Sequence, residues 1–364
     1  SLYPYIYSVS RISFSLFGSK YIDISKNLGL SSFKAFYKVV LPLSRPAIFS
    51  GLFLVIMEVL NEYGAVKYFG VNTYTIGIFR SWNSMNDTEA AIQLSSILLF
   101  IVMFLFFIER FFIQNKRYSF IENSKISLLS NISSKSVVWV YLSCLIPILL
   151  AFIVPVLFNL YNIFDNVDRI ELKRLLHLTF NSVTVSLISS FLILILAIFF
   201  LFSEKLSKSR IYYYVNQFIS LGYSIPGAVV ALALIVFINS IDQSISSVNL
   251  LGTFLVYFFI LIYAYLIRFL AVGKSPIKSS FDKQPETYDL SAKTLGLNNF
   301  KLFEKIYLPI NKYSFFAALI LVFIDIMKEL PITLILRPFN FDTLATQTYE
   351  FAVEEMIPIS SIYS

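Results

Sequence analysis

Long apolar stretches alternate with short polar loops along all 364 residues of this chain. Seven of these stretches approach the 20 or so residues that a helix needs to cross a hydrocarbon core of roughly 30 Å. They cover 45–63, 93–112, 137–158, 177–202, 211–239, 249–270 and 313–331, and a shorter one precedes Arg11. The alternating segments of about ten residues that indicate a transmembrane β-barrel are missing from the sequence. Because a helix satisfies its own backbone polar groups in lipid, we predict an all-α polytopic membrane protein.

One polar loop occurs twice, 267 positions apart. The first copy is ISKNLGLSSFKAFYKVVLPLSRP at 24–46, and the second is SAKTLGLNNFKLFEKIYLPINKY at 291–313. Six predicted spans separate the two copies, and six is an even number, so both loops should face the same compartment. The sequence therefore predicts two parallel, homologous halves rather than an inverted repeat.

Each copy of the loop predicts two short helices joined by a turn. The first should end at a left-handed glycine, and the second should begin after a side-chain N-cap. Two phenylalanines three positions apart should share one face of the second helix, and a proline should end it as the chain re-enters the membrane. In order, these positions are Gly29, Ser31, Phe33, Phe36 and Pro42 in the first copy, and Gly296, Asn298, Phe300, Phe303 and Pro309 in the second.

Two interpretations of this loop are open. Its aromatic side chains could enter a groove on a soluble partner, or the helix could rest on lipid headgroups. Two matched copies favour the partner, because contact with lipid does not require the same Leu-Gly spacing twice.

Composition and charge fix the orientation of the predicted spans. The chain is 57% hydrophobic and 14% charged, well below the 25% or so of charged residues in soluble domains. The loops on the repeat-bearing side hold 19 Lys and Arg residues, and those on the other side hold 6. By the positive-inside rule, the repeated loops should be cytoplasmic.

The net charge of +7 mostly reflects this excess of Lys and Arg in the cytoplasmic loops, and we expect no nucleic-acid partner. The single cysteine excludes an intrachain disulfide.

At the repeated loop the chain resembles the EAA loop of ABC-importer permeases, in which E-A-A-x-x-x-G precedes an ending of the form apolar-x-Leu-Pro. Asp23, Ile24 and Ser25 stand at the E-A-A positions of the first copy, and Leu290, Ser291 and Ala292 stand there in the second. The acid is thus shortened to Asp in one copy and absent from the other, where Asp289 is adjacent. The resemblance implies that Asp23, Gly29, Phe33, Phe36 and Pro42, with Gly296, Phe300, Phe303 and Pro309, belong to coupling helices that dock on ATPase subunits.

Further segments resemble the fused-repeat permeases of ferric-iron importers. They are MEVLNEYGAVKYFGVNTYTIGIFRSW (57–82), LGYSIPGAVVALAL (221–234), YLIRFLAVG (265–273) and MKELPITLILRPFNFDTLATQTYE (327–350). Thiamine and polyamine permeases share the fold and parts of these motifs, so the substrate stays open among these solutes. The resemblance implies a type I ABC-importer permease in a bacterial inner membrane, with no catalytic site and no cofactor of its own.

The implied partners are two ABC ATPase subunits, which carry ATP and Mg²⁺, a periplasmic or lipid-anchored substrate-binding protein, and membrane lipid. No GxxxxGK[ST] pattern occurs in this sequence, so the ATPase must be a separate chain. By the same resemblance, residues 1–112 are the end of a first transmembrane half with its coupling loop at 20–44. Residues 113–136 are a cytoplasmic linker, and residues 137–364 are a second half with its coupling loop at 287–312. The chain begins inside an apolar segment and stops without a closing span, so we expect a fragment that lacks the first spans and the last one.

Four acids continue the 267-residue register into the spans. Glu58 and Glu62 correspond to Asp325 and Glu329, and each pair is spaced i, i+4, which would put both acids on one helix face. A carboxylate at the bilayer centre costs about 2.5–3.5 kcal/mol on insertion scales, so we expect these acids to face away from lipid, near the outer helix ends. They could be neutralised by Lys67, Lys328 or Arg337, line the pathway or its gate, or contact a hard cation such as Fe³⁺ transiently.

Three other features carry interpretations of their own. Ser224 to Gly227 (Ser-Ile-Pro-Gly) predicts a kink, either for packing or at the transport pathway. Arg268 should snorkel towards the cytoplasmic interface. Arg337 could meet an acidic patch on the binding protein or pair locally with Asp342. The intramembrane acids would also suit an ion-driven secondary transporter, which has no need for two matched cytoplasmic loops.

Overall fold

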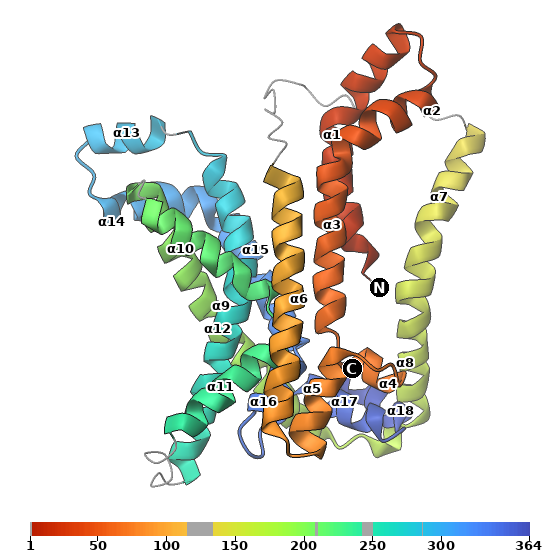
Figure 1. Ribbon diagram of the computed structural model, residues 1–364, viewed down its shortest axis with the longest axis vertical. Helices are drawn as coiled ribbons and strands as arrows, with labels where there is room; N and C mark the ends of the chain where they lie inside the picture. Colours follow the sequence, from red (N-terminus) through yellow and green to blue (C-terminus); the bar gives the residue numbers. More distant parts are fainter. Residues whose placement is uncertain (1, 115–133, 208–209, 242–249, 286) are drawn as a thin grey trace. The chain divides into compact units, whose positions relative to one another are not determined.

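The computed structural model describes residues 2–114, 134–207, 210–241, 250–285 and 287–364. Every regular element in these ranges is a helix (Figure 1), so the predicted all-α class is confirmed. Most of the predicted linker, 115–133, lies outside the described residues. The described chain forms two compact units, residues 1–62 with 100–164 and residues 63–99 with 165–364. The division into two homologous halves concerns the sequence and stays a prediction.

The first unit is built around two neighbouring helices of the N-terminal segment. Its elements are α1 (Tyr3–Asn27), α2 (Ser32–Ala35), α3 (Leu41–Asn61), the later part of α6 (Thr88–Gln114), α7 (Ser134–Ile148) and α8 (Val154–Asp165). Helices α1 and α3 approach closely at Gly51, where an added Cβ would lie 2.9 Å from the Cα atom of Ile6. Continuous helical turns lead from α2 to α3 through the π-helical turn Phe36–Val40.

The second unit has a core of three long helices. Its elements are α4 (Gly64–Tyr68), α5 (Tyr74–Phe79), the start of α6, α9 (Leu172–Ser207), α10 (Arg210–Leu221), α11 (Gly227–Ile241), α12 (Leu250–Asp282), α13 (Thr287–Thr294), α14 (Asn299–Leu302), α15 (Leu308–Met327), α16 (Pro331–Leu336), α17 (Leu344–Val353) and α18 (Ile357–Tyr363). Helices α9, α12 and α15 meet at Gly273, where an added Cβ would lie 2.8 Å from Ile193 and 3.2 Å from Val322. A small residue here lets the three helices pack closely.

The predicted spans have counterparts among the described helices. Six helices are long and apolar enough to cross a membrane: Phe33–Asn61, Thr88–Glu109, Val137–Asp165, Leu172–Ser207, Gly252–Asp282 and Asn299–Met327. Most are longer than predicted because the helical turns continue into the polar flanks. The bent pair Arg210–Ser224 and Gly227–Ile238 would make a seventh span.

The predicted kink is a break between two helices. Helix α10 ends at Leu221, α11 begins at Gly227, and the two meet at 105°. Pro226 lies just before α11, and its carbonyl accepts from the backbone N–H groups of Val229 and Val230 at 3.0 and 3.2 Å. Proline is suited to a helix start, because the N–H that it lacks would have no partner there.

Candidate functional site

The two repeated loops fold into the same turn, here called the repeated turns (residues 28–42 and 295–309). Gly29 and Gly296 both have left-handed backbone, with φ of +82° and +73°. In each copy the residue after the glycine donates to a carbonyl five positions back: Leu30 to Ser25 at 3.0 Å, and Leu297 to Ala292 at 3.1 Å. The predicted glycine caps are confirmed, and each helix ends two residues before its glycine, at Asn27 and Thr294.

Side-chain N-caps start the next helix in both copies. The Ser31 hydroxyl accepts from the Lys34 backbone N–H at 3.5 Å, and the Asn298 Oδ1 atom accepts from that of Lys301 at 2.9 Å. Helices α2 and α14 begin one residue later, at Ser32 and Asn299, as predicted.

The prediction that Pro42 and Pro309 end this element is wrong. Helical turns run without a break through the π-helical turns Phe36–Val40 and Phe303–Tyr307 into α3 and α15. Both prolines lie in the first turn after the π-helical segment. A proline is tolerated at this place because its missing N–H falls where the hydrogen-bond pattern changes. The element before Gly29 is also not short, since it is the 25-residue helix α1.

The two phenylalanines of each turn differ in exposure. Phe33 and Phe300 are 72% and 74% exposed. Phe36 and Phe303 are half-buried, with ring centroids 5.9 Å from Phe14 and 5.2 Å from Phe202 respectively. Phe33 and Phe36 both contact the Tyr37 ring, with centroids 4.8 and 5.5 Å away, and the predicted shared face stays a prediction. Ala35 and Leu302 are buried, and Phe36 and Phe303 follow them by one position, whereas the exposed pair lies about half a helical turn away.

An exposed leucine accompanies the exposed phenylalanine in each copy. Leu28 is 78% exposed and Leu295 is 79% exposed. Each repeated turn thus presents the same two apolar side chains, one before the glycine and one after it.

Asp289 fastens the second turn to the preceding helix. Its Oδ1 atom accepts a hydrogen bond from the buried Tyr307 hydroxyl at 2.7 Å. Asn311, one turn further on, is buried and accepts from Ser280 at 2.6 Å and Gln284 at 2.9 Å. The acid next to the E-A-A position therefore joins α13 to the π-helical turn. The Asp23 side chain lies outside the described part of the chain.

The second acid of each pair lies outside the helix that carries the first. Helix α3 ends at Asn61 and α15 at Met327, so Glu62 and Glu329 lie beyond the helices that carry Glu58 and Asp325. The shared helix face is therefore wrong for Asp325 and Glu329, because the backbone leaves the helix at Lys328, before Glu329. For Glu58 and Glu62 it stays a prediction, since Glu62 directly follows the last residue of α3. The prediction that the acids lie near the ends of their helices holds.

Two of the acids have identified cationic partners. Asp325 pairs with Lys328 at 2.9 Å, one of the predicted partners. Glu329 pairs with Arg268 at 3.5 Å, and the two side chains are 6% and 3% exposed. The snorkelling predicted for Arg268 is wrong, because its guanidinium faces a buried carboxylate. Within the described ranges, no three His, Cys, Asp or Glu side chains gather as a metal site.

Gly227 makes room for this ion pair. A Cβ atom there would clash with the Arg268 guanidinium and would lie 2.7 Å from Glu329 Oε1. Glu329 Oε1 also accepts from the backbone N–H of Ile332 at 3.3 Å. The pair thus joins the start of α11, helix α12 and the turn between α15 and α16.

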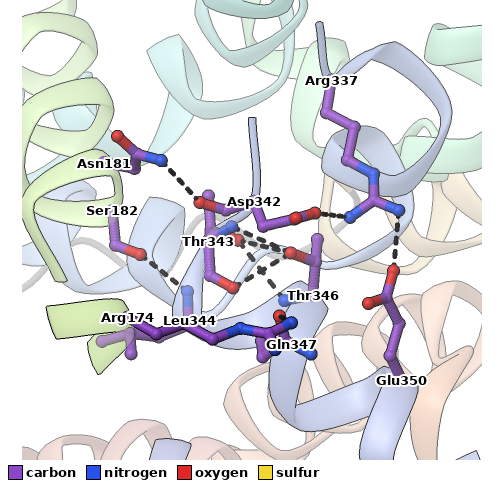
Figure 2. Close-up of polar contacts among 10 residues, drawn as sticks. All are labelled: Arg174, Asn181, Ser182, Arg337, Asp342, Thr343, Leu344, Thr346, Gln347 and Glu350. Atoms are coloured by element: carbon purple, nitrogen blue, oxygen red, sulfur yellow. Dashed lines mark hydrogen bonds and ion pairs between the residues drawn. The ribbon is translucent and has the colours of Figure 1, made fainter. Parts of the chain in front are cut away.

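A second polar network lies at the far end of α15 from the repeated turn. Figure 2 shows Arg337 between Asp342 and Glu350, with the second pair at 2.7 Å. The local pairing of Arg337 with Asp342 is therefore the correct interpretation. Asn181 of α9 donates to the Asp342 carbonyl at 3.0 Å, and Ser182 accepts from the Leu344 N–H at 2.8 Å. Together these contacts fix the segment between α16 and α17 onto α9.

Tyr63 and Tyr349 connect the segment after α3 with α17. Tyr349 donates to the Tyr63 hydroxyl at 2.8 Å, and the Tyr63 ring stacks on Phe79 at 3.8 Å between centroids. Burial raises the pKa of both hydroxyls above that of an exposed tyrosine, and for Tyr63 the contact with Tyr349 raises the pKa further. Both side chains are therefore neutral near pH 7. Both tyrosines lie in segments that resemble iron permeases, 57–82 and 327–350, but nothing in either segment identifies the other tyrosine as its partner.

Comparison with known proteins gives two matches. Residues 1–118 match the family described as the binding-protein-dependent transport system inner membrane component. The chain is also 25% identical, over 350 residues, to the Fe(3+)-transport system permease protein FbpB 2 of Haemophilus influenzae. That match covers 94% of this chain and 67% of the relative, so the chain spans about two thirds of its length.

Proposed function

We propose that this chain, whose residues 1–118 match the family described as the binding-protein-dependent transport system inner membrane component, is the permease subunit of an ATP-driven importer of ferric iron. A component of this family is a transport subunit and not an enzyme. In the proposal, ATP and Mg²⁺ are held by two separate ATPase subunits. A periplasmic or lipid-anchored binding protein delivers the substrate.

The observation that carries the proposal is the identity of the two repeated turns. They share the left-handed glycine, the N-cap, the π-helical turn and the exposed Leu and Phe in one register. Two equal apolar projections suit two equal grooves on a pair of identical motor subunits. Because helical turns continue from each repeated turn into a span, displacement of the turn would move α3 or α15 directly.

The proposed transport cycle is alternating access driven from the repeated turns. Closure of the ATPase pair moves both turns together, and the spans attached to them open the pathway on one side and close it on the other. Glu58, Glu62, Asp325 and Glu329 lie at the ends of α3 and α15 away from the turns, where a gate to the pathway would lie. The pairing of Glu329 with Arg268 and of Asp325 with Lys328 supports a structural role for these two acids over metal ligation.

Ferric iron as the substrate is supported by the relative from Haemophilus influenzae, which is named as an Fe(3+)-transport permease, and by the resemblance of four segments to iron permeases. The alternative within the same architecture is another small solute, such as thiamine or a polyamine. Uptake of labelled Fe³⁺, thiamine and putrescine into proteoliposomes that hold the permease, its ATPase and its binding protein distinguishes these substrates. Proton- or sodium-driven uptake without an ATPase would instead indicate a secondary transporter.

The coupling role is tested with Phe33→Ala and Phe300→Ala. Both side chains are exposed, so the variants should insert and fold like the wild type. We expect each variant to lower ATP-driven uptake at least about tenfold, as for loss of an interface hot spot. Phe180→Ala, at an exposed position of α9, is the matched control and should keep full uptake. Normal uptake in the double variant Phe33→Ala/Phe300→Ala would refute the coupling role.

A further inference from the structure

A second repeat lies at the opposite ends of α3 and α15 from the repeated turns. The segments FGVNT (69–73) and FNFDT (339–343) are 270 positions apart and follow α4 and α16 respectively; they are called the distal loops here. Both form the same structure. Gly70 and Asn340 have left-handed backbone, with φ of +67° and +61°. Thr73 and Thr343 then cap the next helix, each accepting from a backbone N–H three residues on at 3.4 Å.

The first residue of each distal loop is an exposed aromatic. Phe69 is 76% exposed and Phe339 is 92% exposed. Phe341, two positions further along, is 7% exposed and packs on Phe254 and Phe258. The loop therefore buries one phenylalanine in the protein and holds the other outside it.

Both exposed rings stand on ordered backbone. In the second loop, Arg337 holds Asp342 and Glu350, and Asn181 and Ser182 of α9 hold the backbone at Asp342 and Leu344 (Figure 2). In the first, the backbone N–H of Val71 reaches the carbonyl of Val66 at 2.9 Å. A ring fixed in this way loses little conformational freedom when it binds a partner.

The setting of these rings favours a soluble protein over lipid. The backbone that follows each ring is irregular, and irregular backbone exposed to lipid does not occur in the hydrocarbon region. The Arg337–Glu350 ion pair beside Phe339 is about one third exposed. The distal ends of α3 and α15 are those that a soluble delivery protein would approach, if the repeated turns face the ATPases.

We propose that Phe69 and Phe339 are twin anchor residues for the substrate-binding protein, each entering an apolar pocket on that partner. This inference rests on the proposed function and extends it to the opposite face. Both loops belong to the same compact unit, so one partner would meet a pair of rings supported by one body. Aromatic side chains that fill pockets dominate the energies of such interfaces.

The test uses proteoliposomes with the complete importer and purified Fe³⁺-loaded binding protein, titrated while ATP hydrolysis is measured. We expect Phe69→Ala/Phe339→Ala to raise the half-maximal concentration of binding protein about tenfold or more, with the maximal rate retained. Phe180→Ala, again the control on an exposed face of α9, should leave this concentration within about twofold of the wild-type value.

A cross-linking experiment tests the contact directly. The chain has one cysteine, Cys144, so Cys144→Ser allows a benzophenone label at Phe339→Cys or at Phe180→Cys. An adduct with the binding protein is expected from the first label and not from the second.

The possible outcomes separate the inference from the proposed function. An unchanged titration in the double variant, with no adduct from the Phe339→Cys label, would refute the anchor role of the two rings and leave the proposed importer function intact. Lower membrane insertion or thermal stability with an unchanged titration would assign the two rings to lipid. A wild-type importer that the binding protein does not stimulate would overturn the proposed function and the anchors with it.

Discussion

Arg268 and Glu329 form an ion pair across two helical segments, with 3.5 Å between Nη1 and Oε1 and almost no exposure of either side chain. Glu329 lies directly after the span that leads from the second repeated turn, and Arg268 lies on α12. Gly227, at the start of α11, leaves the space that the pair occupies. The ion pair therefore lies where the α15–α16 turn, helix α12 and the start of α11 meet.

The pair gives the first prediction. Arg268→Met should lower the free energy of unfolding by about 3–5 kcal/mol, because it leaves a buried carboxylate without its cation. Arg268→Met/Glu329→Leu should recover most of this loss, since the double change removes both charges from the buried site. Thermal unfolding of the purified protein in detergent measures both effects.

A matched surface pair controls for the loss of any ion pair. Lys328→Met removes the partner of Asp325, but Lys328 is 53% exposed, so this change should alter stability by less than about 1 kcal/mol. If Arg268→Met and Lys328→Met were equally mild, the pair with Glu329 would contribute little to stability.

The repeated turns could be predicted from the sequence because their bonds are local. Gly29 closes a helix through a bond between Leu30 and Ser25, and Asn298 caps a helix through Lys301. Every partner lies within five residues, so residue type and spacing carry the information. The partial burial of Phe36 could not be predicted, because it depends on contact with Phe14 of α1, which lies outside the loop.

The long-range contacts could not be predicted from the sequence. The place of Arg268 near the end of a hydrophobic stretch favours the membrane interface, and nothing in that stretch identifies Glu329 as its partner. The distal loops leave a sequence signal, but the repeat offset changes from 267 to 270 between Glu329 and Phe339. A comparison of the two halves at one fixed offset misses this second repeat. A comparison that allows the offset to change by three positions would reveal FGVNT and FNFDT.

Of the two helical glycines Gly222 and Gly77, Gly222 is predicted to tolerate substitution by alanine less well. A Cβ atom at Gly222 would overlap the backbone carbonyl oxygen of Ile267, which cannot move without shifting α12. Gly222→Ala should therefore destabilise the protein by about 1–3 kcal/mol or more. At Gly77, the corresponding contact is the end of the Leu94 side chain at 3.3 Å, which can rotate away.

Gly77→Ala is thus the matched control for that prediction. It should be neutral or slightly stabilising, since alanine is favoured over glycine in a helix by about 1 kcal/mol. Detergent melting curves of the two alanine variants compare them directly. Equal melting temperatures would mean that α12 moves to admit the methyl group at Gly222.

Phe300 and Phe303 should separate coupling from stability. Phe303 packs on Phe202 and Phe315, with centroids 5.2 and 6.4 Å away, so Phe303→Ala should lower the free energy of unfolding by about 2 kcal/mol or more. Phe300 is exposed, and Phe300→Ala should change it by no more than about 0.5 kcal/mol. Unfolding of both variants without the ATPase measures stability alone, and a large loss in Phe300→Ala would show that this ring packs within the permease.

The tyrosine pair predicts a loss of stability in alkali. The folded-state pKa values of Tyr63 and Tyr349 are raised by burial, whereas an unfolded tyrosine titrates near pH 10. The folded state therefore retains protons that the unfolded state releases, so this contribution is complete below about pH 10 and declines as the pH rises above it. Tyr63→Phe/Tyr349→Phe should lose about 0.5–1.5 kcal/mol at pH 8 through the missing hydrogen bond. Between pH 8 and pH 11, the melting temperature of this double variant should fall less steeply than that of the wild type. Parallel declines of the two melting temperatures would show that the hydroxyls titrate as in the unfolded chain.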